Sequence, residues 1–300
     1  MATMSRHRAI VTMLLVTLLW SIAGIVTRQL DSARGFEVTF WRSAATVVSL
    51  VAILGWMRGP QRLRRDIVDG GWPLLLSSLC WAVMFTAFTK ALTMTTVANV
   101  LVTMALGPLF TALIAAAALR HRLAARTWAA IVVAGIGIVW MVGEPMRGGA
   151  TDHLPGIAVA LLVPLAGAVN WTLLQSLAQK ARLDEGTEAR DMMPALIGGA
   201  VISSLVALPL AWPFAGTAHD VAWLSMLGLV QLAIPCLLAV RVARSLEAPE
   251  ISLLALTEVL FGVAWVWIGT SESPNAGVVV GGLLVVGALA ANEWLAMRWG

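Results

Sequence analysis

Long apolar runs separated by short breaks are the feature that most constrains how this chain can fold. Ten runs follow one another, each close to the roughly 20 residues that cross the hydrocarbon core of a membrane. They cover residues 9–27, 36–57, 72–93, 96–118, 127–143, 155–177, 192–211, 219–240, 250–270 and 276–297. The sequence therefore predicts an all-α integral membrane protein with ten transmembrane helices. Eight or nine spans are the alternatives, because the run at 127–143 is short.

The composition favours the same class. Hydrophobic residues make up 59% of the 300 residues and charged residues only 12%, against roughly 25% charged residues in an ordinary soluble domain. The net charge is +4, but the basic residues lie between apolar runs, so they indicate membrane orientation and not a nucleic-acid partner. Cys80 and Cys236 lie inside apolar runs, where we expect free thiols, with no disulfide, metal site or other cofactor. The run at 9–27 is too long for the apolar part of a cleaved signal and is predicted to be the first span.

The basic residues also predict the orientation. With the N-terminus in the cytoplasm, 15 of the 20 lysines and arginines fall in cytoplasmic breaks and only four in outer breaks. The remaining one, Arg42, lies within the second run. We therefore expect a multi-pass protein of the cell inner (plasma) membrane with both termini cytoplasmic.

A weak internal repeat divides the chain into halves. A shift of 151 residues places Trp20 on Trp171, Pro108 on Val259, and the end of the fourth run on the end of the ninth. Each half then has five spans, an odd number that inverts the second half in the membrane. This predicts two inverted five-helix repeats, residues 1–148 and 149–300, around a central site that opens to either side in turn.

Five short motifs lie along the chain, four in the first predicted half and one in the second. They are Leu18-Leu19-Trp20-Ser21, Phe40-Trp41-Arg42, Lys90-Ala91-Leu92, Leu106-Gly107-Pro108 and Leu256-Thr257-Glu258-Val259, with Glu272 fourteen positions after Glu258. Together they resemble the EamA-type transporters of the drug/metabolite transporter superfamily, and the likeness covers nearly the whole chain. The chain departs from the pattern at Val259, where proline is usual, and at His121, where glutamate is usual. The valine predicts a softer helix break in the ninth span.

This resemblance implies a fold of ten spans in two inverted halves. It also implies export of amino acids or related small metabolites, with the aromatic amino-acid exporters as the nearest subgroup.

Two charged residues lie inside the predicted spans. Glu258 is about 12 Å into the ninth run, where a bare carboxylate is costly, so it is a candidate substrate contact or proton carrier, with a structural carboxylate as an equal alternative. Arg42 lies near the outer end of the second run, where an interfacial anchor is the favoured interpretation and a clamp for a substrate carboxylate the sharper one.

Uncharged residues complete the candidate site. Asn99, Asn170 and Gln231 can bind a solute, although helix packing is their commoner role. Trp20, Trp81 and Trp171 lie deep enough to line a cavity, and Gly107 belongs to the motif of the fourth span. Prolines inside spans produce kinks or breaks, and the hinge candidates are Pro108, Pro164 and Pro235.

These observations favour a secondary transporter for a small molecule, and the resemblance implies aromatic or other hydrophobic amino acids as its substrates. The alternatives are an intramembrane enzyme and an assembly scaffold. The chain has four histidines, all near the ends of runs, and no paired intramembrane aspartates, so we expect no catalytic residues. It also has no nucleotide-binding loop.

Overall fold

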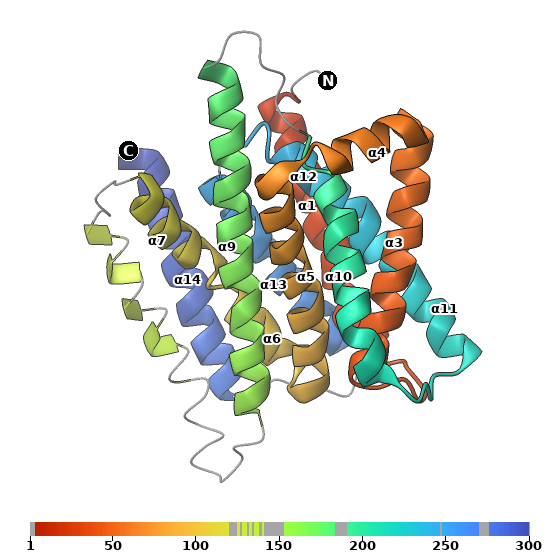
Figure 1. The fold of residues 1–300 in the computed structure, drawn as a ribbon. Helices are drawn as coiled ribbons and strands as arrows, with labels where there is room; N and C mark the ends of the chain where they lie inside the picture. Colours follow the sequence, from red (N-terminus) through yellow and green to blue (C-terminus); the bar gives the residue numbers. More distant parts are fainter. Residues whose placement is uncertain are drawn as a thin grey trace.

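The computed structural model describes residues 4–119, 125–126, 128–130, 132–133, 135–137, 140, 153–183, 191–246, 248–269 and 276–299 (Figure 1). Every regular element in these residues is helical. The first half contains α1 (Arg6–Ser21), α2 (Ala23–Thr27), α3 (Phe36–Arg58), α4 (Pro60–Val68), α5 (Gly71–Met94), α6 (Val97–Met104) and α7 (Gly107–Leu119). The second half contains α9 (Leu154–Leu183), α10 (Pro194–Ala211), α11 (Ala218–Met226), the π-helix η1 (Leu227–Ala233), α12 (Ile234–Val242), α13 (Ala248–Gly269) and α14 (Ala276–Trp299).

The helices form an upright bundle, as expected for a membrane-spanning protein. Within the described residues, seven helices are long and apolar enough to cross a membrane. They are Arg6–Thr27, Phe36–Arg58, Gly71–Met94, Asn99–Ala117, Leu154–Ala181, Pro194–Ala211 and Ala218–Val242. The predicted runs at 250–270 and 276–297 fall on α13 and α14, and about half of the run at 127–143 lies outside the described residues. The prediction of an all-α membrane protein is thus confirmed.

Three of the spans are interrupted. The first is divided at Ile22 between α1 and α2, and the fourth at residues 105–106 between α6 and α7. Pro108 explains the second break, because proline has no N–H to bond to the carbonyl of Met104. Pro235 likewise cannot donate to the carbonyl of Gln231, and it is the second residue of α12, which follows η1, where the helix widens to π geometry.

The other predicted hinge and the predicted soft break lie in continuous helices. Pro164 is inside α9, which runs unbroken through it. α13 runs unbroken through Glu258 and Val259, because valine keeps the backbone donor that Pro108 lacks in the fourth span. Pro108 and Val259, which the predicted repeat aligns, therefore differ in their effect: the span is broken near Pro108 and continuous at Val259.

Glycines allow the central helices to approach closely. α5, α10 and α3 pack side by side, and a Cβ at Gly199 of α10 would overlap the side chain of Trp81. A Cβ at Gly228 of η1 would come within 2.7 Å of the backbone oxygen of Arg42 in α3. This approach sets the distance between η1 and the helix that carries Arg42.

One end of the bundle is closed by a carboxylate from each half. Asp220, 0% exposed in the first turn of α11, accepts backbone N–H bonds from Asp31 at 2.7 Å, Ser32 at 3.0 Å and Ala33 at 2.9 Å. It also completes a capping box with Thr217. One aspartate therefore holds the loop between α2 and α3 against the start of α11.

Glu37 makes the reciprocal contact. It lies in the first turn of α3, is 4% exposed, and accepts N–H bonds from Ala215 at 3.0 Å and Gly216 at 2.8 Å. We call the contacts of Asp220 with residues 31–33 and of Glu37 with residues 215–216 the carboxylate clasp. It lies at the end of the bundle opposite to α4 (Figure 1).

The end that carries α4 is held by side-chain ion pairs. Arg58, at the end of α3, pairs with Asp66 of α4 at 3.4 Å and with Asp191, which precedes α10. Asp191 also pairs with Arg244, 3.1 Å away, just after α12. Polar contacts between the predicted halves therefore join helices at both ends of the bundle.

The approach at Gly228 gives a test of this packing. We expect Gly228→Ala to lower the free energy of unfolding in detergent by about 1–3 kcal/mol, because the added methyl meets backbone atoms that cannot rotate away. The control is Gly55→Ala in α3, where a Cβ meets no atom within 4 Å. Thermal unfolding followed by helical circular dichroism checks both variants, and equal midpoints would contradict the packing described.

Candidate functional site

A cavity lies in the middle of the bundle, among α1, α3, α5, α6, α7, α9, η1, α12 and α13. Its volume is about 130 Å³, close to the roughly 150 Å³ of engineered cavities that hold benzene. Nine of the predicted site and hinge residues line it: Trp20, Arg42, Trp81, Gly107, Pro108, Pro164, Trp171, Gln231 and Glu258. The structure thus brings residues from both predicted halves to one place.

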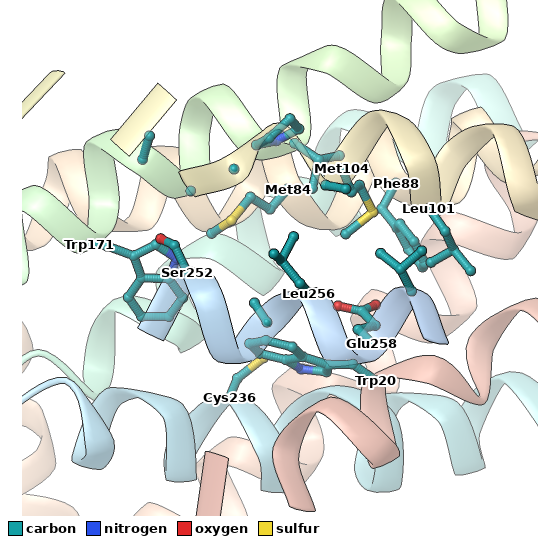
Figure 2. Close-up of a pocket in the computed structure, with 18 of the residues that line it drawn as sticks. Trp20, Met84, Phe88, Leu101, Met104, Trp171, Cys236, Ser252, Leu256 and Glu258 are labelled. Carbon is teal, nitrogen blue, oxygen red and sulfur yellow. The ribbon is translucent and has the colours of Figure 1, made fainter. Parts of the chain in front are cut away.

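Glu258 is the acidic group of this cavity. It is 6% exposed and, among the described residues, it has neither a hydrogen bond nor an ion pair. Figure 2 shows its carboxylate pointing into the space bounded by Trp20 of α1, Leu101 of α6 and Phe88 of α5. A buried carboxylate is stabilised when it binds a proton, water or a cation, so this group is available to a ligand.

Arg42 is the basic group of the cavity, and the prediction of an interfacial anchor is wrong for it. The side chain is 1% exposed, so it does not extend to the end of the bundle. Its Nη2 donates to the carbonyl of Phe85 at 2.6 Å, its Nη1 lies 3.4 Å from Oε1 of Gln231, and its guanidinium carbon lies 5.7 Å from the ring centre of Phe88. The Nε is buried without a partner, and no carboxylate of the described residues pairs with the guanidinium. The carbonyl of Phe85 in α5 and the amide of Gln231 in η1 bind the guanidinium inside the bundle, so the side chain does not snorkel.

Gln231 connects Arg42 to the broken first span. Its Oε1 accepts from Arg42, and its Nε2 donates to the backbone oxygen of Trp20 at 3.4 Å. Gln231 belongs to η1, and π segments within helices are frequent at functional sites. The amide therefore links a charged cavity residue to the turn of α1 that precedes the break.

Aromatic rings and thioethers form the apolar wall. The rings of Trp81 and Trp171 meet edge to face with centres 5.7 Å apart, and Phe85 lies 5.5 Å from Trp81. Met84 and Met104 fill the space nearby (Figure 2). Flat rings and flexible thioethers suit an apolar or aromatic group of variable shape.

Asn99, Asn170 and Pro235 do not line the cavity. Asn99 donates to the Thr95 hydroxyl at 2.9 Å, and Asn170 accepts from Ser77 at 2.7 Å, so both amides serve helix packing. Asn170 was predicted because it precedes Trp171, but neighbours in a helix point about 100° apart: Trp171 meets Trp81 at the cavity, whereas Asn170 bonds to Ser77, further along α5.

Several lining residues were missed in the sequence. They include Met84, Phe85, Phe88, Leu101, Met104, Thr111, Cys236, Ser252 and Leu256. Helical spacing was the available signal: Met84, Phe85 and Phe88 follow Trp81 by three, four and seven residues. Thr111 and Ser252, bonded to each other at 3.1 Å, carry no such signal because they belong to different halves.

A second cluster has ligand types that suit a cation. Ligand atoms of Asp31, His219 and Asp220 lie within 4.8 Å of one another. The Asp220 oxygens already accept the N–H bonds of the carboxylate clasp, and His219 lies 3.1 Å from Asp31. The cluster is therefore accounted for by closure of this end of the bundle.

The comparison with known proteins agrees with this arrangement. The sequence profile described as the EamA-like transporter family matches residues 7–143. Residues 7–143 belong to the EamA-like transporter family. This EamA segment supplies Trp20, Arg42, Trp81, Gly107 and Pro108 to the cavity. No curated protein matches the chain.

Solved structures extend the likeness to the fold of the whole chain. Twenty-three chains match, and one of them, titled "Crystal structure of protein", superposes with a TM-score of 0.67 at 18% identity. The match covers 98% of this chain and 99% of that one. The whole chain, which includes the EamA segment and the residues that follow it, therefore has an overall fold already seen in solved structures.

The orphaned indole N–H of Trp81 provides a test of the cavity wall. Trp81 Nε1 is buried without a partner, whereas Trp265 Nε1 donates to the Ser21 hydroxyl at 3.0 Å. Both Trp→Phe changes remove similar volume, but only Trp265→Phe breaks a hydrogen bond. We expect Trp81→Phe to be less destabilising by roughly 1 kcal/mol, measured by thermal unfolding in detergent. A Trp81→Phe variant that is the less stable of the two would show that this N–H has a partner.

Proposed function

We propose that the chain is a secondary transporter that exports amino acids, aromatic or other hydrophobic ones, or related small metabolites across the inner membrane. Its two inverted halves, residues 1–148 and 149–300, form ten spans with both termini in the cytoplasm. The observation that carries this proposal is the carboxylate of Glu258, which has no partner among the described residues and faces a central cavity with an aromatic wall. Membership of residues 7–143 in a transporter family supports it.

The cavity chemistry matches a zwitterion with an apolar side chain. Glu258 would bind the ammonium group, and Arg42 would bind the carboxylate through donors not used by Phe85 and Gln231. The wall of Trp81, Trp171 and the methionines would take the side chain. A cavity volume of about 130 Å³ leaves room for a small solute and not for a lipid or a peptide.

Alternating access fits the way the bundle is closed. The carboxylate clasp closes one end, and the ion pairs of Arg58, Asp191 and Arg244 join helices at the other. Release of one set while the other holds would open the cavity to one side only. The breaks after Trp20 and before Gly107 border the cavity and are the proposed points of bending.

The cavity favours transport over intramembrane catalysis. Its titratable side chains in the described part of the chain are Arg42, Cys236 and Glu258. General acid–base chemistry needs a second proton-transferring group close to the first, and neither a histidine nor a second carboxylate is among these lining residues.

Efflux from proteoliposomes tests the proposal. Wild-type protein should release labelled phenylalanine or tryptophan, and Glu258→Gln should reduce the rate by about tenfold or more, because the amide loses the charge that binds the ammonium group. Glu250→Gln is the control, since Glu250 lies in the same helix but pairs with Arg6 outside the cavity. Efflux at the level of empty liposomes for every amino acid tried would refute amino-acid export.

The same liposomes decide whether Glu258 also carries a proton. An imposed pH gradient should alter the wild-type rate and leave residual Glu258→Gln transport unaffected if the carboxylate couples the two fluxes. Equal wild-type rates with and without the gradient would indicate facilitated diffusion.

The role of Arg42 is tested with a substrate that lacks a carboxylate. Phenylalanine amide should compete with labelled phenylalanine about tenfold more weakly than phenylalanine itself in the wild type. Arg42→Gln should abolish this discrimination, and Arg42→Lys should retain much of it because the cation remains. Unchanged discrimination in Arg42→Gln would assign the arginine to packing alone.

A further inference from the structure

The short helix α4 differs from the others in its direction and exposure. It crosses the end of the bundle between α3 and α5 (Figure 1). Gly59, with φ of +83°, permits the sharp turn out of α3, and Pro60 starts the helix. Leu63 is 6% exposed and belongs to the main apolar core, so it fixes α4 to the bundle.

The outward surface of α4 is basic. Arg62, Arg64 and Arg65 are all exposed, and in the described part of the chain none of them has a hydrogen bond or ion pair. Asp66 is already paired with Arg58, so among the described acids that line the groove beside α4 only Asp69 is left to offset the three cations. The surface therefore keeps a positive charge that no contact with the described residues satisfies.

Apolar side chains border these arginines. Trp56 is 89% exposed at the end of α3, Trp72 is 67% exposed at the start of α5, and Val68 is 72% exposed at the end of α4. Since α3 and α5 are spans, α4 lies where the hydrocarbon gives way to headgroups. Tryptophan beside exposed cations is the pattern of segments at that level of a membrane.

We propose that α4, with Trp56 and Trp72, binds the headgroups of anionic phospholipids. Arg62 and Arg65 line one polar groove with Pro60 and Asp69, and they present guanidinium groups to a lipid phosphate from adjacent turns. Arg64 lies on another side of the helix and contacts neighbouring headgroups. The tryptophans place their rings at the boundary and keep α4 at headgroup depth. This binding surface is independent of the central cavity and of what the cavity binds.

Charge complementarity selects the occupant. Anionic lipids give the membrane surface a negative potential that attracts clustered arginines and lysines. A soluble acidic protein would have to approach a surface that the exposed tryptophans and Val68 hold against the bilayer. Lipid satisfies the basic and the apolar side chains together.

Native mass spectrometry of the full chain in detergent tests the proposal. The protein is incubated with equal amounts of phosphatidylglycerol and phosphatidylcholine, and the retained lipids are counted. Wild type should retain phosphatidylglycerol preferentially. In the triple variant Arg62→Gln, Arg64→Gln, Arg65→Gln, the ratio of retained phosphatidylglycerol to retained phosphatidylcholine should fall about tenfold or more.

Two further variants separate the surface from general charge and from misfolding. The triple variant Arg8→Gln, Lys180→Gln, Arg298→Gln removes three exposed cations from α1, α9 and α14 and should keep the preference. Replacement of the three α4 arginines by lysine should also keep it. The proposal would be overturned if the wild type shows no preference for phosphatidylglycerol, or if both glutamine variants lose the preference equally. It would also be overturned if the lysine variant has normal helical content but does not retain phosphatidylglycerol.

Discussion

A charged side chain is tolerated inside a membrane only when nearby groups replace the interactions that water would make with it. Arg42 meets this constraint with a backbone carbonyl, an amide oxygen and an aromatic ring, and Glu258 meets it only by facing a cavity. The helices around these two residues are arranged accordingly. η1 comes close to α3 at Gly228, and this places Gln231 beside the guanidinium, while α13 stays unbroken and holds the carboxylate at a fixed depth.

Features that depend on the chemistry of one segment alone could be predicted from the sequence. Apolar runs predicted the helices. The lone charges and deep tryptophans predicted five of the residues that meet in the cavity, and Gly107, Gln231 and two span prolines bring the number to nine. Prediction from the sequence failed where an outcome depends on the neighbouring helix. Arg42 has the length and position to snorkel, and only the carbonyl of Phe85 on α5 shows why it turns inward. Asn99 and Asn170 have cavity-compatible chemistry, but Thr95 accepts from the Asn99 amide and Ser77 donates to the Asn170 Oδ1, both away from the cavity lining.

The fourth span is broken near Pro108, but the position that the predicted repeat aligns with it is not broken. Pro108 divides the fourth span, whereas Val259, its counterpart after a shift of 151 residues, leaves α13 continuous. α13 is also tied to the first span by the bond between Thr17 and Thr257 at 2.8 Å and by Trp265 on Ser21. The intact helix and its bonds to α1 support Glu258, whereas the breaks after Ser21 and before Gly107 lie in helices of the first half.

The carboxylate clasp has a consequence for how this protein can vary. Its donors are backbone N–H groups of residues 31–33 and 215–216, so the identity of the side chains in these loops matters little to the contact. We expect substitutions at residues 31, 32 and 215 to be tolerated as long as they keep an amide hydrogen and the loop length, whereas a Cβ at Gly216 would come within 2.7 Å of Glu37 Oε1 and Ala33 is buried. Glu37 and Asp220 have no such freedom, because each offers two oxygens to several donors at once. Relatives could thus diverge widely in these loops, with selection acting on two acidic positions and against proline or deletions opposite them.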